Sequence, residues 1–151
     1  MSKKTRRKLG DVLMIPLGDG SFGYGRVLEE PLVAFYDLRN NKPGALDEIV
    51  SKKVAFKVWV MNYAITDGDW PVLGNLPLEP ELTTEPLFFK KDPISKALSI
   101  YRDSTGEKVP ASRIDCEKLE CAAAWEPEHV VDRLNDHFAG RPNGWVESMR
   151  P

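Results

Sequence analysis

The sequence predicts a mainly β, α+β fold: an antiparallel, strongly bent or barrel-like sheet with one C-terminal amphipathic helix packed on it. Apolar residues alternate with other residues in several short runs that are separated by glycine- and proline-rich turns, a pattern typical of antiparallel strands. Near the end of the chain, apolar residues instead recur every three or four positions, which indicates a helix.

The first part of the chain predicts a three-stranded meander. Its expected strands are residues 11–16, 22–28 and 32–37. Residues 18–21 form the first turn, because their glycines supply the positive φ that tight hairpins need. The second strand alternates large and small residues and includes Gly23 and Gly25. Strand interiors tolerate glycine where something packs closely, so these positions favour a tightly bent sheet.

Residues 54–65 give the strongest strand signal. Valine and aromatic residues occupy both faces of this run, which predicts a central strand that is covered on each side. A helix is the competing interpretation, but the same valine and aromatic content argues against it. A single helical turn is expected just before, at residues 45–50.

The second half of the chain predicts shorter elements. Residues 66–86 are rich in proline and glycine and are expected to cross the surface as a long excursion. The remaining expected elements are strands at 87–89 and 97–101, a turn at 102–106 and a last strand at 119–125.

The closing helix is expected from Pro127, which suits a first helical position, to Gly140, which suits a helix stop. Its apolar stripe consists of Val130, Val131, Leu134 and Phe138. This stripe predicts that the helix packs on the sheet.

At 151 residues the chain is expected to form a single globular domain over residues 9–151, preceded by a flexible basic arm at residues 1–8. The net charge of −2 gives no general attraction to nucleic acid or anionic membranes. No apolar run approaches the roughly 18 residues that span a bilayer, so a cytoplasmic location is expected.

Signals for chemistry are sparse, and no cofactor, metal ligand or catalytic residue is assigned. Residues 18–23 match GxGxxG as a string, but a strand follows, so a glycine-rich hairpin is favoured over a phosphate loop. Cys116 and Cys121 form no CxxC pair and are expected to be reduced core residues.

The two histidines, His129 and His137, lie eight residues apart on the closing helix, whereas a helical metal pair prefers three or four. His129 shares a face with Asp132 and Asp136, which leaves a weak metal site open beside the default of a solvated face.

A stretch without cations is the most informative charge pattern. No lysine or arginine lies between Lys57 and Lys90, yet acidic side chains and apolar residues are mixed there. Exposed acids steer a basic protein partner, and exposed apolar anchors that become buried on binding give affinity. The candidate partner-binding residues are Asp67, Asp69, Trp70, Glu79, Glu81 and Glu85. Two alternatives stay open: a solubilising loop whose leucines face inward, and a cation site at Asp67 and Asp69.

Four segments together resemble the immunity protein 26 family, which is also named for a phosphotriesterase-like protein, HocA. They are residues 10–17, the Gly-Tyr-Gly-Arg run 23–26, residues 56–61 and the Trp-Pro-Val-Leu-Gly run 70–74. The resemblance spans roughly residues 9–92. It implies a mainly β bacterial protein that binds a cognate domain of a polymorphic toxin and blocks its active site.

The resemblance carries no position-specific binding motif. The family's second name leaves a metal-dependent hydrolase of phosphotriesters as the alternative activity. Such chemistry uses a metal to activate water. A nucleic-acid-binding barrel is a further possibility for a small β domain, but the overall acidity argues against it.

Overall fold

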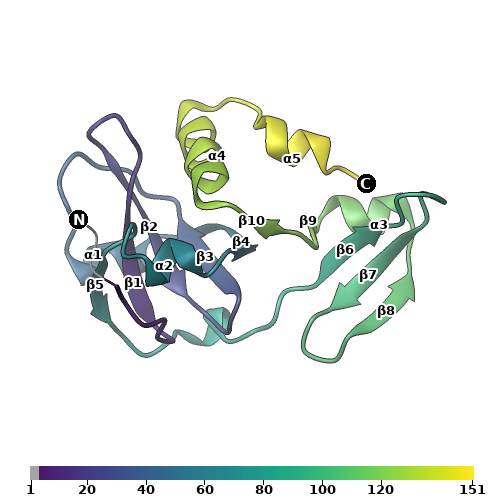
Figure 1. Cartoon of the computed structure of the whole chain (residues 1–151), viewed down its shortest axis with the longest axis horizontal. Coiled ribbons are helices and arrows are strands. Elements are labelled where there is room, and N and C mark those ends of the chain that lie inside the picture. Colours follow the sequence, from purple (N-terminus) through teal and green to yellow (C-terminus); the bar gives the residue numbers. More distant parts are fainter. Residues whose placement is uncertain (1–3) are drawn as a thin grey trace.

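The computed structural model describes residues 4–151 and places the strands in two sheets (Figure 1). The first sheet has six strands in the order β10-β4-β3-β2-β1-β5, and the second has four in the order β8-β7-β6-β9. In Figure 1 the first sheet lies on the left and the second on the right, with helices α4 and α5 above them.

The strands are β1 (Asp11–Pro16), β2 (Phe22–Val27), β3 (Leu32–Tyr36), β4 (Val54–Val60), β5 (Val72–Asn75), β6 (Phe88–Lys91), β7 (Leu98–Arg102), β8 (Glu107–Pro110), β9 (Glu120–Cys121) and β10 (Ala124–Trp125). The helices are α1 (Leu46–Ser51), α2 (Tyr63–Thr66), α3 (Arg113–Glu117), α4 (Pro127–Ala139) and α5 (Gly144–Ser148), with a 3₁₀ turn η1 (Pro80–Leu82).

The prediction of a mainly β, α+β chain is confirmed. Strands β1 to β3 form the expected antiparallel meander, and β4 extends it by pairing with β3. The sheets are open rather than barrel-like, and each contains a parallel pair, β10 with β4 and β9 with β6. The strands β9 and β10 follow one another in the chain, and each joins a different sheet.

The glycines of the meander serve the two purposes expected of them. Gly18 and Gly20 have φ of +88° and +87°, so the GxGxxG string is a hairpin turn between β1 and β2. At Gly25, an added Cβ would lie 3.2 Å from the carbonyl oxygen of Ala34 on the neighbouring strand. A close approach between strands therefore explains this glycine.

The expected strand over 54–65 is wrong beyond Val60, because the chain turns into α2 there. The helical turn buries Ala64 and Ile65 completely, so the last apolar residues of this run are satisfied without an extended backbone. Residues 66–86 are also more ordered than expected, since β5 pairs with β1 at the sheet edge. The predicted strand at 119–125 divides into β9 and β10, which belong to different sheets.

The main core lies between the first sheet and α4. Val58 of the sheet and Val130 and Leu134 of α4 have no exposed surface. Helix α4 begins at Pro127 and is capped by Gly140 in the left-handed region with φ of +69°, so the closing helix is confirmed. Helix α5 follows it and was not predicted.

A second core joins the two sheets on the opposite face. The Trp59 ring of β4 lies 4.6 Å from the Phe88 ring of β6 and 6.1 Å from the Tyr101 ring of β7, centroid to centroid. Leu32, Ala34 and Leu82 are buried in the same cluster. These contacts hold the second sheet against the first.

The expected basic arm at residues 1–8 begins with residues 1–3, which lie outside the described residues. From Lys4 onward the arm contacts α2 and the β2–β3 connection. Thr5 donates its N–H to the carbonyl oxygen of Thr66, the last residue of α2, at 2.9 Å. Arg7 donates to the carbonyl oxygens of Leu28 and Leu32 at 2.9 and 2.8 Å. Within residues 4–151, no helix combines the length and apolar character needed to cross a membrane.

Candidate functional site

The predicted acidic residues lie in three separate places. Asp67 and Asp69 follow α2, Glu79 and Glu81 lie at η1, and Glu85 contacts the turn between β7 and β8. The structure therefore does not gather these carboxylates into one continuous acidic surface.

Asp67 and Asp69 lie beside the N-terminal segment. The Lys4 ammonium donates to Asp67 at 2.8 Å, and this hydrogen bond and the Asp67 charge raise the pKa of Lys4. Both side chains are largely exposed, at 83% for Lys4 and 41% for Asp67, so the pair adds little stability. Asp69 is also exposed. Both acids stay within reach of a partner.

Trp70 is buried, with 3% of its surface exposed, and its ring packs edge-on against Phe35 in the main core. Leu82 is also buried, with 6% of its surface exposed. The expectation that Trp70 is an exposed anchor is therefore wrong, because the ring fills the core beneath the meander. Trp70 and Leu82 therefore agree with the alternative interpretation, in which apolar residues of this stretch face inward.

Glu79 is tied to Arg26, the largest fully buried side chain of the described residues. Arg26 donates Nε to the Gly10 carbonyl oxygen at 2.9 Å and two further bonds to the carbonyl oxygens of Leu76 and Pro77 at 2.8 and 2.9 Å. Its remaining nitrogen donates to the Tyr36 hydroxyl and to Glu79, each at 3.0 Å. All five N–H donors of the guanidinium thus have acceptors.

This network explains why Glu79 lies where it does. The ion pair with Arg26 neutralises its charge and fixes residues 76–79 to the first sheet. Burial raises the pKa of Tyr36, although the Arg26 hydrogen bond opposes the shift, so its hydroxyl stays protonated at neutral pH. The role that these contacts give Glu79 is therefore structural.

Beside this network lies a groove of about 300 Å³ between α1, β4 and η1. Val50, Val54 and Leu82 give it an apolar lining, and its polar residues are Tyr36, Lys52, Lys53, Lys57, Glu79 and Glu81. Burial lowers the pKa of Lys57, whose ammonium donates to the Glu81 carbonyl oxygen at 3.1 Å. Because Arg26 neutralises Glu79, lysine charge predominates at this groove.

Glu85 is used inside the fold. It accepts hydrogen bonds from the Ser104 N–H and hydroxyl at 3.1 and 2.9 Å and pairs with Arg102 at 3.4 Å. These bonds attach the β7–β8 turn to the segment before β6. Glu85 is consequently less available to a partner than Asp69 or Glu81, which are exposed.

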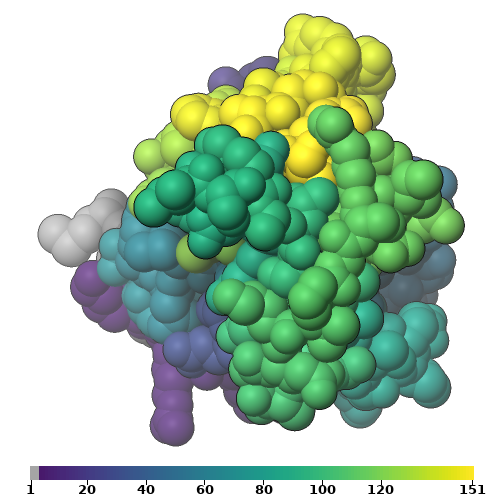
Figure 2. Space-filling view, turned by 90° about the vertical axis from the view of Figure 1, so that its right-hand side faces the viewer, coloured from purple at the N-terminus to yellow at the C-terminus, as the bar shows by residue number. Residues whose placement is uncertain are grey.

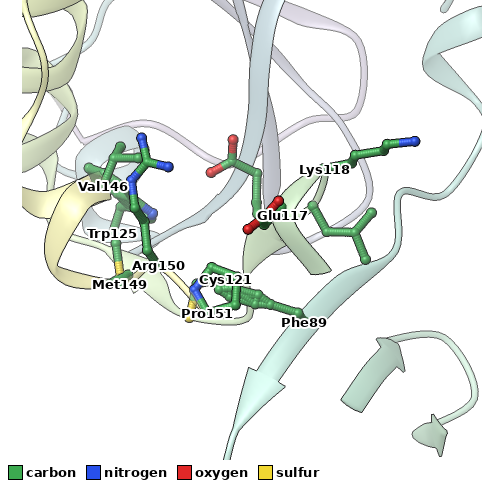
Figure 3. Close-up of a pocket in the computed structure, with 11 residues that line it drawn as sticks. Phe89, Glu117, Lys118, Cys121, Trp125, Val146, Met149, Arg150 and Pro151 are labelled. Carbon is green, nitrogen blue, oxygen red and sulfur yellow. The ribbon is translucent and has the colours of Figure 1, made fainter. Parts of the chain in front are cut away.

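A second pocket, of about 180 Å³, lies between β6 and the C-terminal residues (Figure 3). Figure 3 shows Phe89 and Cys121 on one side of it and Val146, Met149 and Arg150 of the last segment on the other. Burial, reinforced by the Glu120 charge, raises the pKa of the Cys121 thiol. A thiol held in its protonated form is a poor nucleophile.

The remaining candidates for chemistry have structural partners. His137 lies 2.8 Å from Asp37, and the His129 ring stacks on Trp145 with centroids 3.7 Å apart. Asp132 accepts from the Trp145 indole N–H, and Asp136 accepts from Arg141 and Asn143. Across residues 4–151, no three His, Cys, Asp or Glu side chains are placed to hold a metal ion together.

The described residues therefore form grooves and charged surfaces. Comparison with protein families gives a match over residues 8–99 to the model described as Immunity protein 26. Neither a curated protein nor a solved structure matches the chain.

Proposed function

The chain belongs to the immunity protein 26 family, and from this membership we propose that it binds a cognate bacterial polymorphic toxin domain and neutralises it by occluding its active site. The observation that carries the proposal is the family match over residues 8–99, which is more than half of the 151 residues. The proposed place of action is the bacterial cytoplasm, where the cognate toxin would otherwise damage its producer.

Occlusion is within the reach of a chain of this size. A stable protein interface covers roughly 800 Å² on each partner, which is about a tenth of the 8663 Å² accessible surface of this protein. One face can therefore cover the mouth of an active site while most of the surface stays free. No specific feature of residues 4–151 favours the phosphotriester hydrolase, whose metal would need a set of ligands.

The cognate toxin is proposed to present basic groups to the exposed carboxylates of the predicted set. Asp69 and Glu81 are exposed, and Asp67 is 41% exposed beside Lys4. Charges at the rim of an interface act mainly on the rate of association, so these acids are assigned to steering the toxin rather than to its affinity.

The direct test is co-expression with the toxin domain encoded by the adjacent gene. We expect the chain to restore growth to cells that express this toxin and to form a stoichiometric complex with the inactivated domain. A chain that neither protects the cells nor binds the purified domain would refute the proposed function.

The steering role has its own test. The double variant Asp69→Lys and Glu81→Lys should slow association roughly tenfold at low salt and reduce its dependence on salt. The matched control, Glu29→Lys with Asp47→Lys, makes the same change of charge at exposed sites outside the stretch. Equal association rates for the two variants would show that these carboxylates do not steer the toxin.

A further inference from the structure

The turn between β6 and β7 holds an isoleucine almost entirely out of the fold. Ile94 is 91% exposed, although isoleucine is among the residues most often buried. The Asp92 carboxylate accepts the backbone N–H groups of Ile94 and Ser95, each at 2.8 Å. The Asp92 N–H donates to the Ala97 carbonyl oxygen, and the Lys96 N–H donates to that of Asp92, each at 2.9 Å. The exposed position of Ile94 is thus fixed by a hydrogen-bonded turn.

Lysines surround this turn. They are Lys90, Lys91, Lys96 and Lys108. The Lys90 ammonium lies 3.9 Å from the centre of the Tyr101 ring, and that of Lys96 donates to the Pro93 carbonyl oxygen at 3.0 Å. Within residues 4–151, every ion pair with a carboxylate involves a cation other than these four. The Asp92 carboxylate accepts hydrogen bonds from the backbone amides of Ser95 and Ile94, and these bonds, with a smaller contribution from the Lys108 charge, lower its pKa.

Beside Ile94 the surface is hollowed. A depression of about 440 Å³ is lined by Lys90, Lys91 and Lys108 together with Leu98 and prolines. Figure 2 shows this side of the molecule, with the β7–β8 hairpin in green at the front and α5 in yellow above it. By the strand register, Lys90 and Lys108 lie on one side of the second sheet and Lys91 lies on the other. We call these three lysines, together with Ile94 and Lys96 of the turn, the lysine hairpin face.

The neighbouring sheet edge has features that disfavour pairing with a strand of a partner protein. Strand β8 is the edge of its sheet, and all four of its residues are exposed. Pro110 lacks an N–H, and Lys108 places a charge on the same short strand, two features that discourage edge-to-edge pairing. A partner would therefore contact this side through side chains.

We propose that the lysine hairpin face docks on an acidic surface of the toxin domain that also has an apolar recess for Ile94. The inference rests on the proposed function and adds a second contact, with an acidic area of the toxin domain, to the basic groups proposed to meet Asp69 and Glu81. Charge complementarity supports an acidic partner, because none of the four lysines forms an ion pair with a carboxylate within residues 4–151. A fixed apolar anchor within a charged rim is the arrangement that gives protein interfaces their affinity.

Two other polyanionic partners fit less well. A branched aliphatic anchor cannot stack on bases, and Tyr101, the aromatic ring of this face, is covered by Lys90. The net charge of −2 also opposes binding to nucleic acid or to an anionic membrane. Neither argument applies to a protein partner whose surface is acidic only over a limited area.

The test measures binding of the full chain to the adjacent gene's toxin domain, inactivated in its active site. Ile94→Ser should weaken binding roughly 30-fold, as expected for an anchor in the centre of an interface. Lys91→Glu with Lys96→Glu should slow association roughly tenfold at low salt. The control variant Lys8→Glu with Lys42→Glu makes the same charge change at exposed lysines elsewhere and should bind like the unaltered chain.

Each outcome separates this inference from the proposed function. If the unaltered chain binds and protects while the hairpin variants equal the control, the proposed function stands and the docking face is refuted. If the unaltered chain does not bind the toxin domain, both fail. The same variants are measured against single-stranded DNA and phosphatidylglycerol vesicles, and a loss confined to either probe would also overturn the proposal. Because the altered residues are exposed, unchanged thermal unfolding should show that the variants fold.

Discussion

At the scale of single residues, the buried Arg26 side chain joins three separate segments of the chain. Its guanidinium joins Gly10 before β1, Tyr36 on β3 and the segment from Leu76 to Glu79. Breaking a buried ionic network by removing one partner costs about 3–5 kcal/mol, because the remaining groups stay buried without hydrogen bonds.

We therefore predict that Arg26→Met lowers the free energy of unfolding by about 3–5 kcal/mol. The measurement is urea denaturation followed by circular dichroism. The control is Arg113→Met, which removes an exposed pair with Glu117 at 4.0 Å and should cost less than about 1 kcal/mol. Similar losses for the two variants would show that the buried network contributes no more than a surface pair.

Gly10 gives a second prediction at this scale, because both its backbone and its surroundings require glycine. Its φ is +90°, and an added Cβ would lie 2.5 Å from the Leu76 carbonyl oxygen. Gly20 has nearly the same φ, +87°, but has no atom within 4 Å of an added Cβ. Both alanine variants should incur the strain of positive φ, about 1–2 kcal/mol. Gly10→Ala should lower the free energy of unfolding by at least about 2 kcal/mol more than Gly20→Ala does, because the backbone at Leu76 must move. Thermal or urea denaturation measures the difference. Equal losses would show that the segment at Leu76 yields easily.

The candidate residues show what sequence reasoning can and cannot reach. The stretch without cations was visible, but the partners of its acids come from distant positions: Lys4 for Asp67, Arg26 for Glu79 and Arg102 for Glu85. Only the tertiary fold brings such pairs together. The sequence shows that Lys90 and Lys91 are neighbours, but it does not place Lys108 near them. That proximity comes from the fold, because β6 and β8 both pair with β7.

At the scale of elements, strands with period-two patterns were predictable, and short edge elements were not. Strand β1 has the predicted bounds, Asp11–Pro16, and β2 and β3 each end one residue earlier than predicted. Strands β5 and β8 contain glycine or proline and largely exposed residues, so their sequences resemble loops. They become strands because β1 and β7 offer free hydrogen-bonding edges.

The β1–β2 hairpin gives a prediction about pH. In its turn, Asp19 accepts hydrogen bonds from the hydroxyl and N–H of Ser21 and pairs with Arg39 at 3.0 Å. These bonds, the Ser21 hydroxyl first, lower the Asp19 pKa from 3.8 to about 2. A carboxyl whose pKa is depressed by folding contributes stability that is complete above its unfolded pKa and disappears as the pH falls through its folded pKa.

The contribution of Asp19 should therefore be lost between about pH 4 and pH 2. We predict that Asp19→Asn makes the urea midpoint less dependent on pH within this window and leaves the dependence above it unchanged. Asp47→Asn, which removes an exposed carboxylate of α1, is the control. An unchanged slope for Asp19→Asn would mean that the turn does not depend on the ionised carboxylate.

At the scale of the whole molecule, the two sheets differ in burial. In the first sheet, all of β3 and most of β1 and β2 are buried. In the second, β7 is only half-buried along its length and β8 is exposed throughout. Segments with little buried apolar surface open with a smaller free energy than the core, so the second sheet should be the less stable part.

Trp59 is the residue on which attachment of the second sheet most depends, because its ring contacts both Phe88 and Tyr101. We predict that Trp59→Ala reduces hydrogen-exchange protection in β6 and β7 by about 2–3 kcal/mol while protection in β1 to β3 changes less. The control is Trp145→Ala, which removes a 42% exposed ring stacked on His129 and should leave β6 and β7 unchanged. An equal loss across both sheets would show instead that they open as one cooperative unit. In that case the lysine hairpin face would be as rigid as the core, and little of its binding free energy would be spent on ordering it.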